Sequence, residues 1–298
     1  MSAWEALRAD PLPWLLDERQ PNLVWRTLVE LVGRPATSPA VERARGGASA
    51  AEPVASLLER LAPDGTWMTR ATPWARYHGP GWRLVAATAW GADPEDPRLA
   101  AAAGRLLATA PGAGGFAARA GEPPSSPITA RALQALARLG LFRHPRCQEA
   151  LAWFEEQTGN PDPVTAVALL SALAEGDELR RQGLRDRASA ALLQALERAG
   201  SLSTGHPNLL RTDPVEVLRA LALAAIPYHP RLAPALERVQ QAQDGQGRWS
   251  LAVASPASLP LGEGRPRVGE PSPWVTLAAL VAILRYGEAA SLPRLFPE

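Results

Sequence analysis

The chain of 298 residues contains no lysine, so all 31 of its Lys-plus-Arg residues are arginine. This absence excludes chemistry that needs a lysine amine, including Schiff-base catalysis, phosphate-loop nucleotide binding and kinase-type phosphoryl transfer. The chain has only one cysteine, Cys147, which excludes an internal disulfide framework and a metal site built from several cysteines. A single cysteine fits a reducing compartment, and we expect a cytoplasmic protein.

The chain also lacks a large net charge and a long hydrophobic segment. The arginines are balanced by 30 acidic residues, which leaves a net charge of +1 and predicts no nucleic-acid partner. The longest uncharged apolar run, Trp274 to Leu284, is too short to span a membrane. The segment from Met1 to Trp14 lacks the apolar centre of a signal peptide. With 46% hydrophobic residues, the chain is long enough to bury one large core.

What the chain does contain is an internal repeat, whose copies we call the first series of helix starts. In each clear copy a residue that can cap a helix is followed by proline and then by an apolar segment. A Ser or Asp side chain accepts free N–H groups of the first helical turn, and proline loses nothing at a position whose N–H has no partner. The clear copies are Ser126-Pro127, Asp162-Pro163, Asp213-Pro214 and Ser272-Pro273, and the looser ones are Gln20-Pro21 and Gly79-Pro80.

A second series of helix starts alternates with the first along the sequence, and the segments that follow these starts differ in their distribution of charged and apolar residues. Its segments are amphipathic, whereas first-series segments such as 164–174 carry no charge, which is typical of a buried helix. No segment shows the sustained alternation of a strand. The two series predict an all-α protein of about six antiparallel helical hairpins. The second-series copies are Asp96-Pro97, His144-Pro145, His229-Pro230, Leu292-Pro293 and a weaker Ser38-Pro39, and the copy expected near 178–187 lacks the proline.

Glycine turns that each deliver one aromatic residue follow the second-series segments, at 64–67, 114–116 and 243–249. The last of them, Gln243-Asp244-Gly245-Gln246-Gly247-Arg248-Trp249, resembles the Q-x-x-D-G-x-W loop of squalene–hopene cyclases and protein prenyltransferase β subunits. The resemblance implies an α/α toroid over residues 20–298, in which inner helices surround an apolar cavity. Residues 1–19 are then expected to form a short helical extension outside the ring.

The catalytic motifs of both families are missing. Class II cyclases protonate an alkene with a D-x-D-D motif. The matching positions here are Asp213-Pro214-Val215-Glu216, where valine replaces the central acid, or Asn160-Pro161-Asp162-Pro163, which keeps a central Asp162 and loses both outer acids. Prenyltransferases need Asp, Cys and His ligands for zinc, and Cys147 lacks that spacing. We therefore expect no metal and no cofactor, and neither activity. The simpler role of Asp162 and Asp213 is to cap helices.

The candidate ligand site combines the aromatic stretch 74–82 with the starts of inner helices. In a toroid these helices run parallel, so their N-termini are expected to gather on one face, where Arg76 and Arg83 could pair with an anionic head group. His78 is the best candidate for a titratable group in a pocket, and an ordinary aromatic packing cluster is the alternative. His206 is expected to face solvent, and the 252–272 loop to act as a lid. The candidate residues are Trp74, Arg76, Tyr77, His78, Trp82, Asp162, Asp213 and Trp274.

Two classes of function remain open from the sequence. The first is a toroid that binds or transforms an apolar small molecule, such as an isoprenoid, in a central cavity. The alternative is a non-catalytic scaffold for a protein partner that the sequence does not identify. A wide aromatic cavity of some hundreds of Å³ would favour the first class. A centre filled by its own side chains, together with an exposed apolar patch elsewhere, would favour the second.

Overall fold

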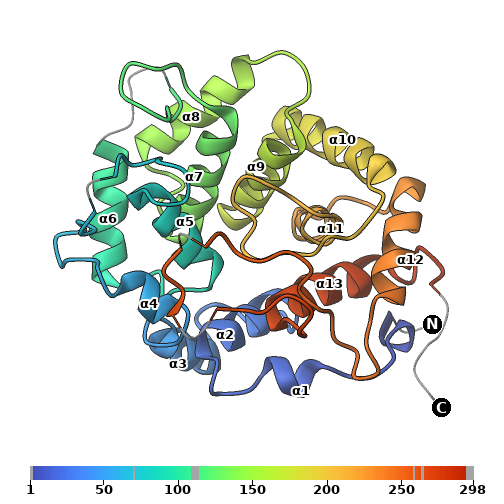
Figure 1. Ribbon diagram of the computed structural model, residues 1–298. Coiled ribbons are helices and arrows are strands. Elements are labelled where there is room, and N and C mark those ends of the chain that lie inside the picture. Colours follow the sequence, from blue (N-terminus) through green and yellow to red (C-terminus); the bar gives the residue numbers. More distant parts are fainter. Residues whose placement is uncertain (1–2, 70, 109–113, 258, 263–264, 293–298) are drawn as a thin grey trace.

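The computed structural model describes residues 3–69, 71–108, 114–257, 259–262 and 265–292. Within these ranges the chain forms thirteen α-helices and two short 3₁₀ helices (Figure 1). No β-strand occurs in the described part of the chain, where extended pairing is limited to isolated bridges. The prediction of an all-helical protein is confirmed.

The first series of helix starts matches six helices of the structure, and each of them has proline in its first turn. The caps predicted at Asp162 and Asp213 are confirmed, because both side chains accept backbone N–H groups of the first turn. At Ser126-Pro127 the cap is one residue earlier than predicted, at Ser125. The first-series helices are α2 (Pro21–Glu30), α5 (Pro80–Ala89), α7 (Ser126–Arg138), α9 (Pro163–Glu175), α11 (Pro214–Leu223) and α13 (Pro273–Tyr286).

The second series also begins helices where predicted. His144 and His229 cap their helices, each accepting the N–H of the residue two positions later, at 3.2 Å. The copy predicted at Pro293 lies outside the described residues. The second-series helices are α3 (Pro39–Ala48), α6 (Pro97–Ala108), α8 (Pro145–Glu156), α10 (Gln182–Arg198) and the 3₁₀ helix η2 (Pro230–Leu232), which continues into α12 (Ala233–Gln241). The remaining helices are short: η1 (Ala3–Ala6), α1 (Leu12–Leu15) and α4 (Val54–Leu58).

Contacts between first-series helices follow the order of the chain and return to its beginning. α5 packs against α7, α7 against α9, α9 against α11 and α11 against α13, and α13 then packs against α2. Two hydrogen bonds join α2 to the end of α5: Trp25 Nε1 donates to the Gly91 carbonyl at 2.7 Å, and Asn22 Nδ2 donates to the Trp90 carbonyl at 3.0 Å. The first-series helices therefore form a continuous series of contacts from α5 to α13 and on to α2 (Figure 1).

The first-series helices are not all parallel, and their N-termini do not all gather on one face. Figure 1 shows α11 end-on, while α13 and α2 lie across the view. Trp90, which follows the C-terminal end of α5, contacts Trp274 at the N-terminal start of α13, with 5.6 Å between ring centroids. The prediction of a common N-terminal face is wrong for these two helices, because side-chain packing sets the crossing angles of neighbouring helices.

The loops that deliver an aromatic residue repeat their hydrogen bonds as well as their sequence. The backbone N–H of Phe116 donates to Thr129 Oγ1 at 2.8 Å, and that of Trp249 donates to Thr276 Oγ1 at 3.0 Å. Each threonine lies four residues after the cap of the next first-series helix. These two loops are therefore joined to the helix that follows them in the same way.

The indole groups of these loops follow a second shared pattern. Trp249 Nε1 donates to the Val239 carbonyl at 2.6 Å, and Trp67 Nε1 donates to the Leu57 carbonyl at 3.2 Å, ten residues earlier in both cases. Both rings are buried, at 1% and 3% exposure. They act as structural side chains that hold a loop against the helix before it, and this satisfies their polar N–H groups in the core.

The N-terminal segment packs onto the last first-series helix. η1 and α1 both contact α13, and Leu7 and Leu15 are completely buried. Gln243, which begins the 243–249 loop, accepts the N–H of Arg8 at 2.9 Å and donates to the Ala6 carbonyl at 3.3 Å. This segment therefore belongs to the same hydrophobic core as the helices of residues 20–292.

Candidate functional site

The predicted aromatic stretch forms a packed cluster. Trp82 contacts Trp74 edge-on, with 5.3 Å between centroids, and contacts Tyr77 at 5.9 Å. Trp82 Nε1 also donates to the Trp74 carbonyl at 3.2 Å, and both tryptophans are buried. Trp74 and Trp82 therefore form an ordinary aromatic packing cluster, which was the alternative to a ligand site. Tyr77 is partly buried and lines a surface groove.

Three further candidate residues lie at the surface. The Arg76 guanidinium covers the Tyr77 ring at 5.3 Å, and His78 is exposed beside it. Asp162 is exposed and caps α9, where its carboxylate accepts the N–H of Val164 at 3.0 Å. None of the three lines the central cavity.

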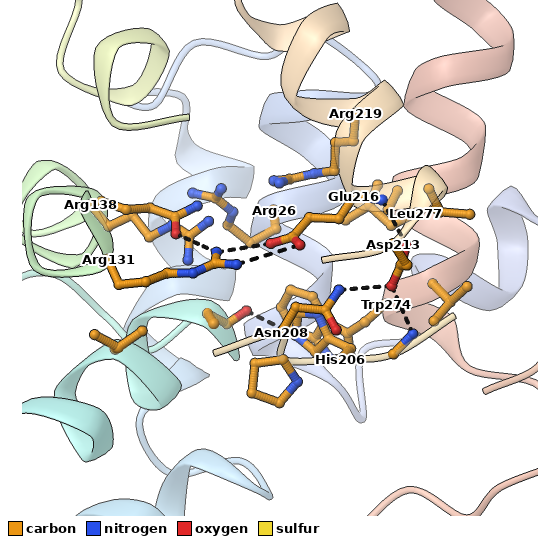
Figure 2. Close-up of a pocket in the computed structure, with 18 residues that line it drawn as sticks. Arg26, Arg131, Arg138, His206, Asn208, Asp213, Glu216, Arg219, Trp274 and Leu277 are labelled. Atoms are coloured by element: carbon orange, nitrogen blue, oxygen red, sulfur yellow. Dashed lines mark hydrogen bonds and ion pairs between the residues drawn. The ribbon is translucent and has the colours of Figure 1, made fainter. Parts of the chain in front are cut away.

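Asp213 and Trp274 are brought together at the centre of the molecule (Figure 2). The cavity there is bounded by α2, α5, α7, α11, α13 and the 205–208 segment, and its volume is about 60 Å³. A water molecule needs roughly 10–15 Å³ on this measure, so the cavity has room for only a few waters. The central cavity is therefore smaller, and its lining more polar, than the apolar cavity that the resemblance to cyclases implies.

His206 contributes to filling this centre, and the expectation that it faces solvent is wrong. Its ring stacks on Trp274, with 4.9 Å between centroids and a 4° angle between planes, and meets the edge of Trp90 at 4.6 Å. Nε2 lies 3.1 Å from the Ala89 carbonyl, which makes Nε2 the protonated nitrogen. Burial lowers the pKa of His206 to about 3, so the ring is neutral at pH 7.

Arg131 holds the loop that carries His206. This guanidinium is 2% exposed and donates to the carbonyls of Leu209 and Arg211 at 2.9 and 3.0 Å. It also pairs with Glu216 at 2.9 Å. The loop before α11 is therefore fixed from α7 by a side chain whose charge is compensated.

Asp213 is the buried acid of this loop. Its carboxylate accepts the N–H groups of Glu216 and Gly205, both at 3.0 Å, and the side-chain amide of Asn208 at 2.7 Å. Burial and the nearby Glu216 charge raise the pKa of Asp213 to about 6 despite these bonds. Asp213 thus serves as a helix cap and as an anchor for the 205–208 segment.

A buried cluster of arginine and glutamate lies at the other side of the cavity (Figure 2 labels Arg26, Arg138 and Arg219). Glu30 binds Arg26 at 2.5 Å and Arg219 at 2.6 Å. Glu175 accepts from Arg138 Nε at 2.9 Å and lies 3.3 Å from Arg26. Burial alone would raise the pKa of Glu30, but Arg219 and Arg26 outweigh it and hold that pKa at about 2. We call these five residues the arginine–glutamate cluster.

The amino-acid pattern does not predict this cluster, because the uncharged first-series segments indicate helices buried among apolar neighbours. A signal was present in the spacing: Arg26 and Glu30 are one turn apart, and Arg131 and Arg138 are two turns apart, so each pair shares a helix face. When an otherwise apolar helix lies at the centre of a protein, charged residues on one of its faces predict a buried polar contact.

A larger groove lies on the other side of the 205–208 segment, which lines both spaces. Its volume is about 470 Å³, and its lining is mostly apolar. The 252–257 segment forms one wall and is fixed in place, because Ala252 N donates to the Thr204 carbonyl at 2.9 Å and Ser255 Oγ donates to the His206 carbonyl at 2.7 Å. Beyond it the loop reaches α4, where Gly262 lies beside Ser56 (Figure 1).

No family model matches the chain, and a search of curated proteins finds no significant match. In the described ranges, none of the helices combines the length and apolar character that crossing a bilayer requires. Among these same residues, no three His, Cys, Asp or Glu side chains gather where they could hold a metal ion.

The neutral state of His206 predicts a specific dependence of stability on pH. The native state binds fewer protons than the unfolded state between pH 6.5 and about 3, so the unfolding free energy contributed by His206 falls as the pH drops through this range. We expect about 2 to 3 kcal/mol of loss between pH 7.5 and 4.5 from this residue. His206→Phe keeps a planar ring on Trp274 but cannot be protonated.

Urea denaturation of both proteins at these two pH values measures this contribution. The shift of Asp213 acts in the opposite direction, since the native state holds its proton up to about pH 6, but it is common to both proteins and cancels in the difference. The parent should lose more stability than His206→Phe. Equal losses in both proteins would mean that His206 is not buried in its neutral form.

Proposed function

We propose that the protein is an α/α-toroid-type helical protein that binds an apolar ligand, such as an isoprenoid, in the groove beside Tyr77. The observation that carries this proposal is the groove, whose volume is about 470 Å³ and whose lining is mostly apolar. Pockets of roughly 300–1,000 Å³ with apolar walls and a few polar groups are typical of small-molecule sites. The lining side chains include Tyr77, Pro207, Leu209, Val253, Pro256 and Ala257.

Two observations support the toroid class. First-series helices contact one another in chain order, and the last of them packs against the first, as closure of a ring requires. The loop that resembles Q-x-x-D-G-x-W uses Trp249 to hold α12, and the 64–67 loop uses Trp67 in the same way. A repeated loop of this kind is expected of a repeat architecture in which each hairpin contacts its neighbours.

The groove also has polar groups at its edge. Arg211 lines it, and Arg76 lies over the Tyr77 ring at 5.3 Å. Arg76 is exposed and can turn toward an anionic head group while the ring of Tyr77 contacts the apolar chain. An amphiphile such as a prenyl diphosphate therefore fits this edge better than a purely apolar molecule.

The scaffold alternative lacks such support. It requires a contiguous exposed apolar surface for a partner. Among the described residues, the large hydrophobic side chains that are mainly exposed are Val32, Met68 and Val268, which belong to three separate segments of the chain. The small-molecule proposal is therefore the one that the geometry favours.

The proposal is tested by filling the groove. Ala254 is exposed on the 252–257 wall, and Ala254→Trp places an indole in the space of the ligand. Titration with a fluorescent prenyl alcohol and its diphosphate should show binding to the parent and none to this variant. Ala100→Trp, on the exposed face of α6, is the matched control and should bind as the parent does.

A second variant separates the contribution of the ligand's head group to binding from that of its apolar hydrocarbon chain. Arg76→Ala should weaken binding of the diphosphate and leave that of the alcohol unchanged, because only the diphosphate carries charge for the guanidinium. If Ala254→Trp remains folded and binds both probes as the parent does, the groove is not the ligand site. If the parent binds neither probe, the proposed function is wrong.

A further inference from the structure

The arginine–glutamate cluster carries more positive charge than its partners neutralise. It joins Arg26 of α2, Arg138 of α7 and Arg219 of α11 to only two carboxylates, Glu30 and Glu175. All three arginine side chains are 10–14% exposed, so water compensates little of this charge. One positive charge is left over at the edge of the central cavity.

The other charged groups that face the cavity are balanced in pairs. Arg131 pairs with Glu216 at 2.9 Å. Asp213 also lines the cavity, but it lies 3.7 Å from Arg211, and its carboxylate accepts three hydrogen bonds from the 205–208 segment and the first turn of α11. His206 is held neutral by burial, which lowers its pKa. The excess charge therefore belongs to the arginine–glutamate cluster.

Arg138 is the group whose donors are least satisfied. Its Nε is 2.9 Å from both oxygens of Glu175, but Nη1 and Nη2 have no acceptor among the described residues. Arg138 lines the cavity, and its side chain is nine-tenths buried. Arg219 Nη1 likewise has no acceptor in the described part of the chain. Both side chains are largely buried, and polar groups at such positions are normally hydrogen-bonded.

The charge environment of Arg138 also favours an added anion. Burial and the neighbouring charges of Arg26 and Arg219 lower its pKa, and Glu175 offsets them only in part. A second negative group beside the outer nitrogens would stabilise the protonated guanidinium. The planar fork of these two nitrogens matches two oxygens of one carboxylate or phosphate.

We propose that the central cavity is a binding site for a small oxyanion, a carboxylate or a phosphate, held by the outer nitrogens of Arg138 with Arg219 beside them. The cavity volume of about 60 Å³ limits the ligand to a few non-hydrogen atoms. The site is separate from the groove, because the 205–208 segment lies between the two spaces. Its existence does not depend on the proposed apolar ligand.

Calorimetric titration of the full chain with acetate and with inorganic phosphate tests the site, with chloride holding the ionic strength constant. The two anions distinguish a carboxylate ligand from a phosphate ligand. Arg138→Lys keeps the charge beside Glu175 but removes the fork, and we expect it to weaken binding about tenfold. Arg105→Lys is the matched control, since Arg105 is 54% exposed and pairs with Asp64 at the surface.

Crystals of the parent soaked in selenate give a readout that does not depend on the stability of any variant. We expect an anomalous peak within hydrogen-bond distance of the outer nitrogens of Arg138. The proposal is overturned if neither anion binds and no peak is found, which would mean that the cavity holds water only. It is also overturned if Arg138→Lys stays folded and binds as tightly as Arg105→Lys.

Discussion

Glu30→Gln should lower the unfolding free energy by about 3 to 5 kcal/mol, the usual cost of removing one partner from a buried ion pair. Glu30 is 4% exposed and binds two guanidinium groups, Arg26 at 2.5 Å and Arg219 at 2.6 Å. Glutamine has nearly the same size but no charge. Among the described residues, the variant therefore leaves Arg26 with Glu175 and Arg219 with no ion-pair partner, and the desolvation of these two cations is no longer compensated.

The matched control for this prediction is a glutamate in a surface pair. Glu95 contacts Arg45 at 2.7 Å but is 70% exposed, so Glu95→Gln should cost less than about 1 kcal/mol. Urea denaturation at pH 7 measures both variants. If Glu30→Gln and Glu95→Gln lose similar amounts, the three arginines of the cluster are compensated by water and the cluster is not a buried ionic network.

Trp249→Ala should also cost about 3 to 5 kcal/mol, because it removes one of the largest fully buried side chains. The indole is 1% exposed, and its Nε1 donates to the Val239 carbonyl of α12 at 2.6 Å. The backbone of the same residue donates to Thr276 of α13 at 3.0 Å. The loop would keep this backbone contact in the variant but lose its attachment to α12.

Trp249→Phe separates the ring from the hydrogen bond. Phenylalanine keeps most of the buried area and lacks the N–H, so its cost should be smaller than that of alanine. Thermal and urea unfolding of the three proteins give the comparison. Equal stability of the parent and Trp249→Ala would contradict the structural role that the repeated loops assign to their tryptophans.

Much of the helix arrangement could be predicted because its signals are local. A cap followed by proline acts within one helical turn, so Asp162-Pro163 and Asp213-Pro214 begin helices whatever surrounds them. The histidines at 144 and 229 cap their helices in the same way. Where the cap is ambiguous, as at Ser125 and Ser126, the pattern located the helix to within one residue.

The candidate site was harder to predict, because its chemistry depends on residues from distant segments. Tyr77 does line the groove and Asp213 with Trp274 line the central cavity, but Arg76, His78 and Asp162 lie at the surface. The sequence does not predict the arginine–glutamate cluster, because an arginine in a helix normally reaches solvent. Only the tertiary structure shows that these side chains of α2, α7, α9 and α11 meet in ion pairs and are largely enclosed.

The sequence by itself determined that this protein is all-helical, where its main helices begin, and which loops deliver a buried tryptophan. Each of these features depends on hydrogen bonds and φ angles within a few residues. Only the tertiary structure decided that the 205–213 loop fills the centre, that His206 stacks on Trp274, and that charged groups from four helices meet around a small cavity. Those outcomes depend on crossing angles and on pairing between charges far apart in the chain, and the free energy of such contacts is set by burial that no local pattern contains.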